Sequence, residues 1–373
     1  MDNLNYRNNV KSYYNLNKLI INDNSLIKNL FRLDQLMVDT FIKRKIFKKI
    51  GEGQTAIILL FKIIREGAFT IKWSNLDISK DDITKINSIV KTYNKINEII
   101  KNDICPNFIY TYKSFNGPFY LLLEYCDGTL NDLIDKLTEI SIIQSHIENI
   151  IKSIFIQLLM GILCMQKIIY MVHIDLRFKN ILYKNIDKNI IFYYNINGKI
   201  YEVKTYGILV IIIDFDGSRR YSNEIKMNND FYKLVEHNNM LIKPYLKKLV
   251  KDYNVDKHDS LSFRLLVDNK LINMKTYNEI QNIYKNKSIS DNKKFNKSIN
   301  ILLKSMNNKQ IKEILPIDVL NLHNILNPII YKIFIKSYKI PIETILYEQF
   351  NEYLVKLSDD KLDENKKLFT MTF

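Results

Sequence analysis

The sequence is poor in the residues that stiffen or cross-link a chain. Among 373 residues there are three cysteines, six prolines, nine glycines and one tryptophan. The cysteines (Cys105, Cys126 and Cys164) show no C-x-x-C spacing, so neither a zinc site nor a disulfide framework is expected. This cysteine usage fits a reducing, intracellular compartment.

Long hydrophobic runs are also missing. The longest apolar run lies near Ile208–Ile213, far below the roughly 20 residues that span a bilayer, and it predicts a buried strand. The first residues are polar and unlike a signal peptide. We therefore expect no membrane span.

Acidic residues are outnumbered, 40 against 55 Lys and Arg, which gives a net charge of +15. This surplus of positive charge favours anionic partners such as a nucleotide, a nucleic acid or an acidic surface. The alternative is that an AT-rich genome has increased the number of lysine residues. No dense basic run marks a nucleic-acid arm, so charge alone supports nucleic-acid binding and no motif does. With 47% hydrophobic and 25% charged residues, the composition is that of a globular protein.

Two segments carry recognisable chemistry, His173-Ile-Asp-Leu-Arg-Phe-Lys-Asn180 and Ile211-Ile-Ile-Asp214-Phe-Asp-Gly217. A carboxylate at 175, an amide at 180 and a carboxylate at 214 suit the holding of Mg²⁺ and nucleotide phosphates beside a base that orients a hydroxyl. The first segment resembles the catalytic loop H-x-D-L-x-x-x-N, and the second the metal-binding D-F-G. Together they resemble the eukaryotic-type protein kinase superfamily.

The resemblance implies a role for each matching residue. Asp175 would orient the substrate hydroxyl, and Arg177 would meet the γ-phosphate with a bidentate grip. Asn180 and Asp214 would hold Mg²⁺. His173 is expected to pack and shape the loop rather than to transfer protons.

Two departures from the family pattern lie in the same segments. Asp216 stands in place of the D-F-G glycine, a change expected to stiffen or reshape the loop. Ile174 replaces the arginine of H-R-D, so switching by activation-loop phosphorylation is not expected.

The segment from Gly51 to Lys72 resembles the nucleotide-binding strands of a kinase small lobe. Gly51 and Gly53 match the glycine-rich loop G-x-G-x-x-G-x-V, where glycines let backbone N–H groups approach phosphate oxygens. Ala56 replaces its third glycine, and Ile58 takes the valine position. Lys72 falls where the superfamily carries its phosphate-pairing lysine.

Further adenine contacts are implied downstream. Thr70 replaces the small alanine under the adenine, and Leu123 takes the gatekeeper position. Backbone groups of Glu124 and Cys126 would meet the adenine, and Leu182 would form the floor of its pocket.

An apolar period from an N-cap at Ser79 to Lys101 predicts the helix that matches the family's C-helix. The superfamily places a glutamate on this helix to hold the lysine. Glu98 is the candidate, and the alternative is that it is a surface glutamate.

Two spacings indicate which group within the superfamily the chain resembles. The long interval from Asn180 to Asp214 contains Ile190–Tyr194, Asn197-Gly198 and Ile200–Val203, which predicts a β-hairpin. This arrangement resembles haspin-like atypical kinases and their relatives in large DNA viruses. The interval from Asp214 to Asp230 is short and holds no A-P-E motif, so a conventional activation segment is not expected.

The predicted fold is α+β, a bilobal protein-kinase-like fold with a small β-rich N-lobe carrying one C-helix and a larger, mainly α C-lobe. The chain is predicted to divide into an N-terminal helical extension (1–44), an N-lobe (45–126) and a C-lobe (127–373). The C-lobe would contain an inserted hairpin (188–212) and a helical insertion (260–320). Within that insertion 288–298 is expected to be an exposed loop, and the tail after Asp359 to be charged and mobile.

The function that follows is an ATP- and Mg²⁺-dependent serine/threonine protein kinase with a protein substrate. Two alternatives stay open. A small-molecule phosphotransferase is favoured by the short segment after Asp214 and the absence of A-P-E, and a pseudokinase scaffold is favoured by Asp216, Glu98 and Thr70. The sequence does not predict the oligomeric state.

Overall fold

The computed structural model describes residues 39–40, 42–45, 47–52, 56–63, 67–74, 80–116, 119–139, 144–220, 243–286, 288–305, 341–355 and 366–373. The predicted N-terminal helical extension (1–44) lies almost wholly outside these residues, and Gly53 and Asp230 lie outside them too. The chain separates into two compact units, one of 1–133, 149–230 and 339–373 and one of 134–148 and 231–338.

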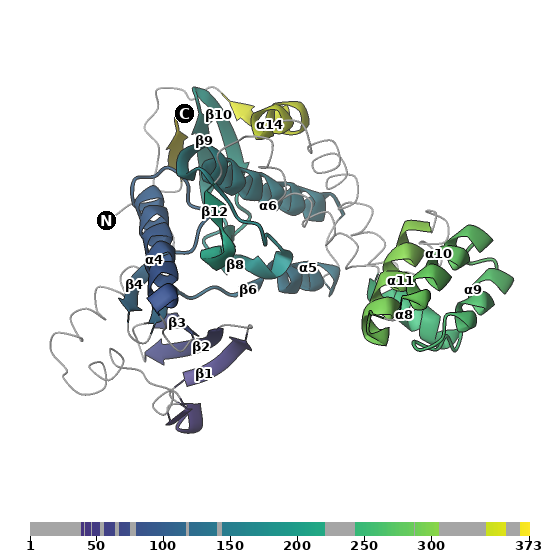
Figure 1. Cartoon of the computed structure of the whole chain (residues 1–373). Coiled ribbons are helices and arrows are strands. Elements are labelled where there is room, and N and C mark those ends of the chain that lie inside the picture. Colours follow the sequence, from purple (N-terminus) through teal and green to yellow (C-terminus); the bar gives the residue numbers. More distant parts are fainter. Residues whose placement is uncertain are drawn as a thin grey trace. The chain divides into compact units, whose positions relative to one another are not determined.

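The first unit begins with a five-stranded antiparallel sheet in the order β1-β2-β3-β5-β4. Its strands are β1 (Phe47–Glu52), β2 (Ala56–Ile63), β3 (Gly67–Ser74), β4 (Thr111–Asn116) and β5 (Phe119–Glu124). Helix α4 (Lys80–Lys101) connects β3 to β4 and contacts the sheet through β4 (Figure 1). This sheet with its one helix is the small β-rich lobe that the sequence predicts.

Helix α4 turns a continuous apolar face inward. Its buried residues recur at helical spacing: Ile86, Ile89, Tyr93, Ile96 and Ile100. This is the stripe expected of a helix that packs against a sheet, and it confirms the helix predicted over this segment.

The middle of the chain combines short strands with helical segments. In order come β6 (Gly128–Thr129), α5 (Leu130–Glu139), α6 (Gln144–Cys164), η2 (Met165–Ile169), β7 (Met171–Val172), η3 (Phe178–Asn180), β8 (Ile181–Asn185), β9 (Ile191–Ile196), β10 (Lys199–Lys204), β11 (Ile208–Ile212), η4 (Phe215–Gly217) and β12 (Arg219–Arg220). Strands β11, β8 and β6 form one sheet, and β12 pairs with β7.

The stretch His146–Ile169 of α6 and η2 is apolar and long enough to cross a bilayer by length and composition. However, 78% of its most apolar 18-residue segment is buried inside the protein. A core helix of a globular protein gives the same pattern.

The predicted hairpin is confirmed by β9 and β10, which pair in register from Ile196 and Lys199 to Ile191 and Lys204. Both turn residues, Asn197 (φ 47°) and Gly198 (φ 87°), have positive φ. This is the conformation that a two-residue Asn-Gly turn requires.

The C-terminal residues are part of this sheet, so the predicted mobile tail is wrong for 366–371. After α14 (Ile342–Phe350) and η9 (Asn351–Tyr353), β13 (Leu354–Val355) and β14 (Lys366–Met371) complete the order β13-β10-β9-β14. Phe369 is buried against Phe192 and Tyr194. The charged composition of the tail predicted exposure to solvent, but its few apolar residues are enough for 366–371 to form a strand beside β9.

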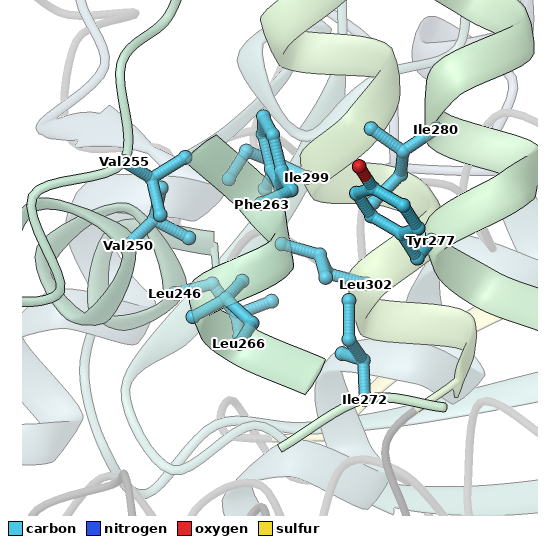
Figure 2. Packing of buried hydrophobic residues seen from close by; sticks show 10 residues of the cluster. All are labelled: Leu246, Val250, Val255, Phe263, Leu266, Ile272, Tyr277, Ile280, Ile299 and Leu302. Carbon is cyan, nitrogen blue, oxygen red and sulfur yellow. The ribbon is translucent and has the colours of Figure 1, made fainter. Parts of the chain in front are cut away.

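The helices of the second unit include α8 (Lys243–Asp252), η6 (Leu261–Phe263), α9 (Arg264–Asp268), α10 (Met274–Lys285) and α11 (Asp291–Ser305). Their inward side chains form a separate apolar cluster around Phe263, Leu266, Ile280 and Leu302 (Figure 2). The loop predicted over 288–298 is wrong from Asp291 onward, because Ile299 and Leu302 give α11 an apolar side that packs into this cluster.

The α+β class is therefore confirmed, and so is the order of elements predicted for a protein-kinase-like fold. The lobe boundaries inferred from the sequence remain a prediction.

Candidate active site

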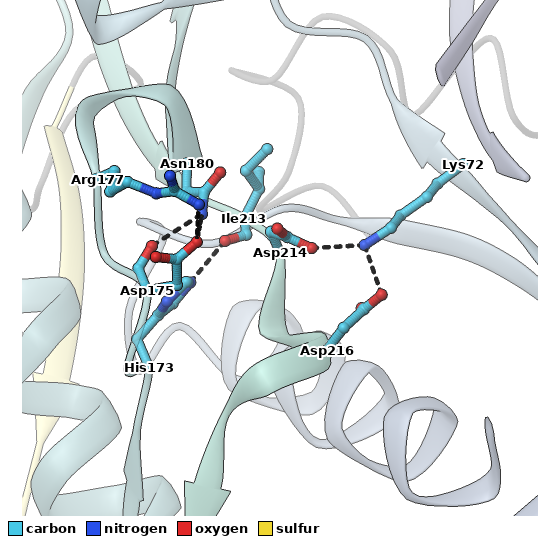
Figure 3. A network of polar contacts seen from close by, with 8 residues as sticks. All are labelled: Lys72, His173, Asp175, Arg177, Asn180, Ile213, Asp214 and Asp216. Carbon is cyan, nitrogen blue, oxygen red and sulfur yellow. Dashed lines mark hydrogen bonds and ion pairs between the residues drawn. The ribbon is translucent and has the colours of Figure 1, made fainter. Parts of the chain in front are cut away.

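The segment from His173 to Asn180 joins β7 to β8 and folds back on itself. The amide Nδ2 of Asn180 donates to the backbone oxygen of Asp175 at 2.8 Å and to its Oδ2 at 3.2 Å (Figure 3). The guanidinium of Arg177 pairs with the same carboxylate. Asp175 therefore has a fixed position while its side chain remains 30% exposed, as a residue that meets substrate must.

His173 acts as a structural support. It is fully buried, its Nε2 lies 2.7 Å from the backbone oxygen of Ile213, and its ring centroid lies 5.3 Å from that of Phe215. These contacts join the catalytic loop to the end of β11. They agree with the prediction that His173 packs and shapes the loop.

Lys72 on β3 meets two carboxylates that follow β11. Its Nζ donates to Oδ1 of Asp214 at 2.6 Å and to Oδ2 of Asp216 at 2.8 Å (Figure 3). The first pair joins residues 142 positions apart in the sequence. The lysine and aspartate predicted to share a phosphate site are thus brought into direct contact.

The ammonium of Lys72 is nearly buried, with 11% of its side chain exposed. Burial acts to lower the pKa of Lys72, whereas the neighbouring Tyr93, Asp216 and Asp214 act to raise it, and the net shift is upward. A raised pKa keeps the amine protonated at neutral pH, which is the state that attracts phosphate.

Glu98 does not hold this lysine. It is exposed on α4, because it lies off the apolar face that packs inward. The α4 residue beside Lys72 is Tyr93, which is 1% exposed and packs edge-on against Phe215 at 5.6 Å. The expectation that Glu98 pairs with Lys72 is therefore wrong, and its alternative, a surface glutamate, is confirmed.

Burial raises the pKa of the Tyr93 hydroxyl. A neutral tyrosine therefore stands where the family carries an acid. The carboxylates that pair with Lys72 are those of Asp214 and Asp216 instead.

The predicted phosphate and adenine positions lie on neighbouring strands. Ile58 pairs directly with Lys72 across β2 and β3, and Thr70 lies opposite Leu123 across β3 and β5. Gly51 lies where the register of β1 against β2 shifts. A shift of this kind bends a strand locally and lets the backbone depart from the sheet.

The segment after β5 is held by a buried ion pair. Oε1 of Glu124 accepts from the backbone N–H of Tyr110 at 2.8 Å, and Oε2 accepts from Nζ of Lys184 at 3.0 Å. The side chains of Glu124 and Lys184 are 1% and 5% exposed. The side chain of Glu124 is thus committed to structure, and a contact of its backbone with adenine remains a prediction.

Cys126 and Leu182 complete the predicted adenine set. Cys126 is half-buried, and Leu182 on β8 is half-buried opposite Thr129 of β6. Both lie in the part of the first unit that follows β5. Whether they contact a nucleotide remains a prediction.

The two predicted metal ligands offer oxygen donors that suit Mg²⁺. Because Nδ2 of Asn180 points to Asp175, its Oδ1 is the atom left for a cation. Asp214 adds a carboxylate that is 41% exposed. Within the described chain, no cluster of three or more His, Cys, Asp or Glu residues suits a metal. Mg²⁺ needs none, because it binds through one or two protein oxygens plus substrate phosphates and waters.

Both segments contain strained backbone. Ile174 (φ 69°) and Asp214 (φ 68°) adopt left-handed conformations, which cost about 1–3 kcal/mol for non-glycine residues and cluster at functional sites. For a β-branched residue such as Ile174 the conformation is rare. The contacts of His173 and Phe215 on either side help to maintain it.

Sequence reasoning missed three contributors to this site: the bond from Asp216 to Lys72, the position of Tyr93, and Lys184 as partner of Glu124. The aspartate at the glycine position was a visible signal for the first. No local signal marks the other two, since their partners lie on other elements.

The elements and the polar side chains that they bring together are arranged as the predicted protein-kinase-like fold requires. Sequence comparison finds protein kinases among the proteins similar to this chain. The chain is 30% identical over 138 residues to "Mitogen-activated protein kinase kinase 2" of Arabidopsis thaliana, across 36% of this chain and 35% of that protein. It is 25% identical over 218 residues to "Probable serine/threonine-protein kinase 380R" of Invertebrate iridescent virus 6, across 52% of this chain and 40% of that protein.

The chain is thus similar to protein kinases, while it spans 35% and 40% of the lengths of these two relatives. No protein-family model matches it. A crystal structure of a kinase domain aligns with a TM-score of 0.41 and 17% identity, over 82% of this chain and 95% of that one. A likeness at that score supports no conclusion.

Proposed function

We propose that this protein is an ATP- and Mg²⁺-dependent kinase that transfers the γ-phosphate to a serine or threonine hydroxyl of a protein. The observation that carries the proposal is the convergence of Lys72, Asp175, Asn180 and Asp214 in one unit. The names of the two curated relatives support the choice of a protein as acceptor.

Each residue has a distinct task in this reaction. Lys72 holds nucleotide phosphates through its protonated amine, and Asp175 orients the acceptor hydroxyl and takes its proton. Arg177 pairs with Asp175 and would meet the γ-phosphate. Asn180 and Asp214 would hold Mg²⁺, and the ion would supply positive charge that offsets the charge of the phosphates.

The transition state of phosphoryl transfer is loose, so positioning and electrostatic stabilisation do most of the work. The bonds from Asn180 to Asp175 and from His173 to the chain before Asp214 serve this purpose. They hold the groups that meet the acceptor and the phosphates on one connected framework.

The finer assignment is to a haspin-like kinase of viral type that works without a conventional activation segment. The hairpin β9–β10 between Asn180 and Asp214 and the similarity to an iridovirus kinase support it. Ile174 in place of the arginine of H-R-D supports independence from activation-loop phosphorylation.

Asp175→Asn tests the proposed function. We expect the variant to bind MgATP like the wild type but to phosphorylate protein roughly 10²- to 10⁴-fold more slowly, because a positioned general base contributes that much. Autophosphorylation mapped by mass spectrometry and MgATP binding by calorimetry measure the two effects.

The same experiment separates the alternatives. Phosphate found on serine or threonine supports a protein kinase, and transfer to small alcohols alone indicates a small-molecule phosphotransferase. A wild type that binds no MgATP and transfers no more phosphate than Asp175→Asn would leave a scaffold function.

A further inference from the structure

We propose that Asp216 is a positioning residue, which anchors Lys72 from the metal-binding loop in the role that an acid on helix α4 would otherwise fill. The inference deepens the proposed function and rests on it. It assigns a task to the aspartate at the glycine position of D-F-G.

The first support is the pairing itself. The described partners of the Lys72 amine are Asp214 at 2.6 Å and Asp216 at 2.8 Å. Helix α4 presents Tyr93 beside this amine, and its Glu98 is exposed. The second carboxylate on the lysine therefore comes from the segment that carries Asp214.

The second support is that Phe215 fixes the direction of its neighbours. Its ring is 2% exposed and packs against Tyr93, Phe108 and His173 at centroid distances of 5.6, 6.1 and 5.3 Å. With Phe215 anchored and Asp214 in a left-handed conformation, the two flanking carboxylates reach the same amine (Figure 3). A glycine at 216 would remove the second carboxylate from the Lys72 amine.

The third support is that the side chains of Asp214 and Asp216 differ in solvent exposure. The side chain of Asp214 is 41% exposed and that of Asp216 is 26% exposed. Oδ1 of Asp216 is buried and has no hydrogen-bond partner among the described residues, so the contact with Lys72 is what compensates the charge of this carboxylate. The more open carboxylate is available to a cation, while the more sheltered one keeps the lysine in place.

Asp216→Asn and Asp216→Glu test this assignment in the full chain. We expect Asp216→Asn to raise KM for MgATP and to lower kcat/KM by about tenfold to a hundredfold, the range of a charge-assisted hydrogen bond. Asp216→Glu keeps the charge and should recover most of this loss. A merely structural role would lower the folded fraction and leave KM for MgATP unchanged in the active molecules.

A second measurement does not depend on kinase activity. At a fixed neutral pH, the labelling rate of the Lys72 amine by an amine-reactive ester is followed by mass spectrometry. We expect several-fold faster labelling in Asp216→Asn than in the wild type. Asp252→Asn, which removes an exposed acid at the end of α8, is the matched control and should label Lys72 at the wild-type rate.

A rescue variant sharpens the result. In Asp216→Gly/Tyr93→Glu the carboxylate is moved to α4, and we expect kcat/KM to recover at least tenfold relative to Asp216→Gly. If this double variant does not fold, since Tyr93 is buried, the single variants decide.

The outcomes separate the two proposals. An active wild type with unchanged KM and unchanged Lys72 labelling in Asp216→Asn would overturn the inference and leave the kinase function standing. A wild type without phosphate transfer would overturn the kinase function, and the labelling rates would still decide whether Asp216 anchors Lys72.

Discussion

The active-site region and the helical cluster of α8–α11 are held together by opposite means. At the active site, charged and polar groups from distant positions meet, as in the 142-residue separation between Lys72 and Asp214. In the helical cluster, apolar side chains such as Leu246, Phe263 and Ile280 meet over short separations. One region is specified by a few directional contacts and the other by shared burial, which has no direction.

This difference implies that the two regions respond differently to substitution. A charge can be removed from the active site with little loss of folded structure and a large loss of chemistry. A side chain removed from the apolar cluster should do the reverse. Three predictions test the contrast, beginning with the largest effect.

Asp214→Asn should lower phosphate transfer roughly 10³-fold, because a metal ligand that stabilises charge is worth several kcal/mol and each 1.36 kcal/mol is a factor of ten. The thermal unfolding midpoint should change little, since 41% of this side chain is exposed. Kinase assays and calorimetry measure the two quantities. Equal losses of activity in Asp214→Asn and in the control Asp252→Asn would contradict the comparison.

Phe263→Ala should destabilise the second unit by about 3–5 kcal/mol, because it removes a fully buried aromatic ring from a packed cluster. Urea unfolding followed by circular dichroism measures the change. Leu261→Ala, at a position that is 62% exposed in the same turn, is the control and should cost less than about 0.5 kcal/mol. Binding of MgATP should be retained by Phe263→Ala under native conditions, and its loss would argue against separate stabilisation.

The smallest effect concerns an exposed charge pair in the helical unit. Hydrogen bonds from His258 and Lys294 lower the pKa of Asp291. The pair therefore contributes stability above the usual pKa of aspartate, and the contribution is lost as the pH falls through the lowered value. His258→Gln should move the pKa of Asp291 upward in a carboxyl NMR titration, whereas Lys293→Gln, at an exposed position on the same helix, should move it less.

Much of the fold follows from local sequence signals. The periodicity of α4, the Asn-Gly turn of β9–β10 and the apolar run of β11 each predicted an element that the structure contains. The two failures, at α11 and at β14, lie in lysine-containing stretches where only a few apolar side chains pack. Composition there pointed to solvent, while a few side chains were enough to hold the segment.

Among the predicted site residues, four that belong to motifs meet in pairs, whereas Glu98, which belongs to none, does not hold Lys72. Lys72, Asp175, Asn180 and Asp214 belong to motifs with fixed spacing, and the structure brings Lys72 to Asp214 and Asn180 to Asp175. Glu98 had no motif of its own, and it lies on the exposed side of α4. The partner of Lys72 could not be predicted because it depends on how α4 is rotated against the sheet.

The sequence by itself determined which chemical groups this protein can use, because the lysine, the acids and the amide stand in recognisable order along the chain. The tertiary structure decided which of them meet. Rotation of α4 placed Tyr93 beside Lys72 and left Asp216 as the second acid. Contacts between distant segments are decided by packing of the whole unit, and no local pattern carries that information.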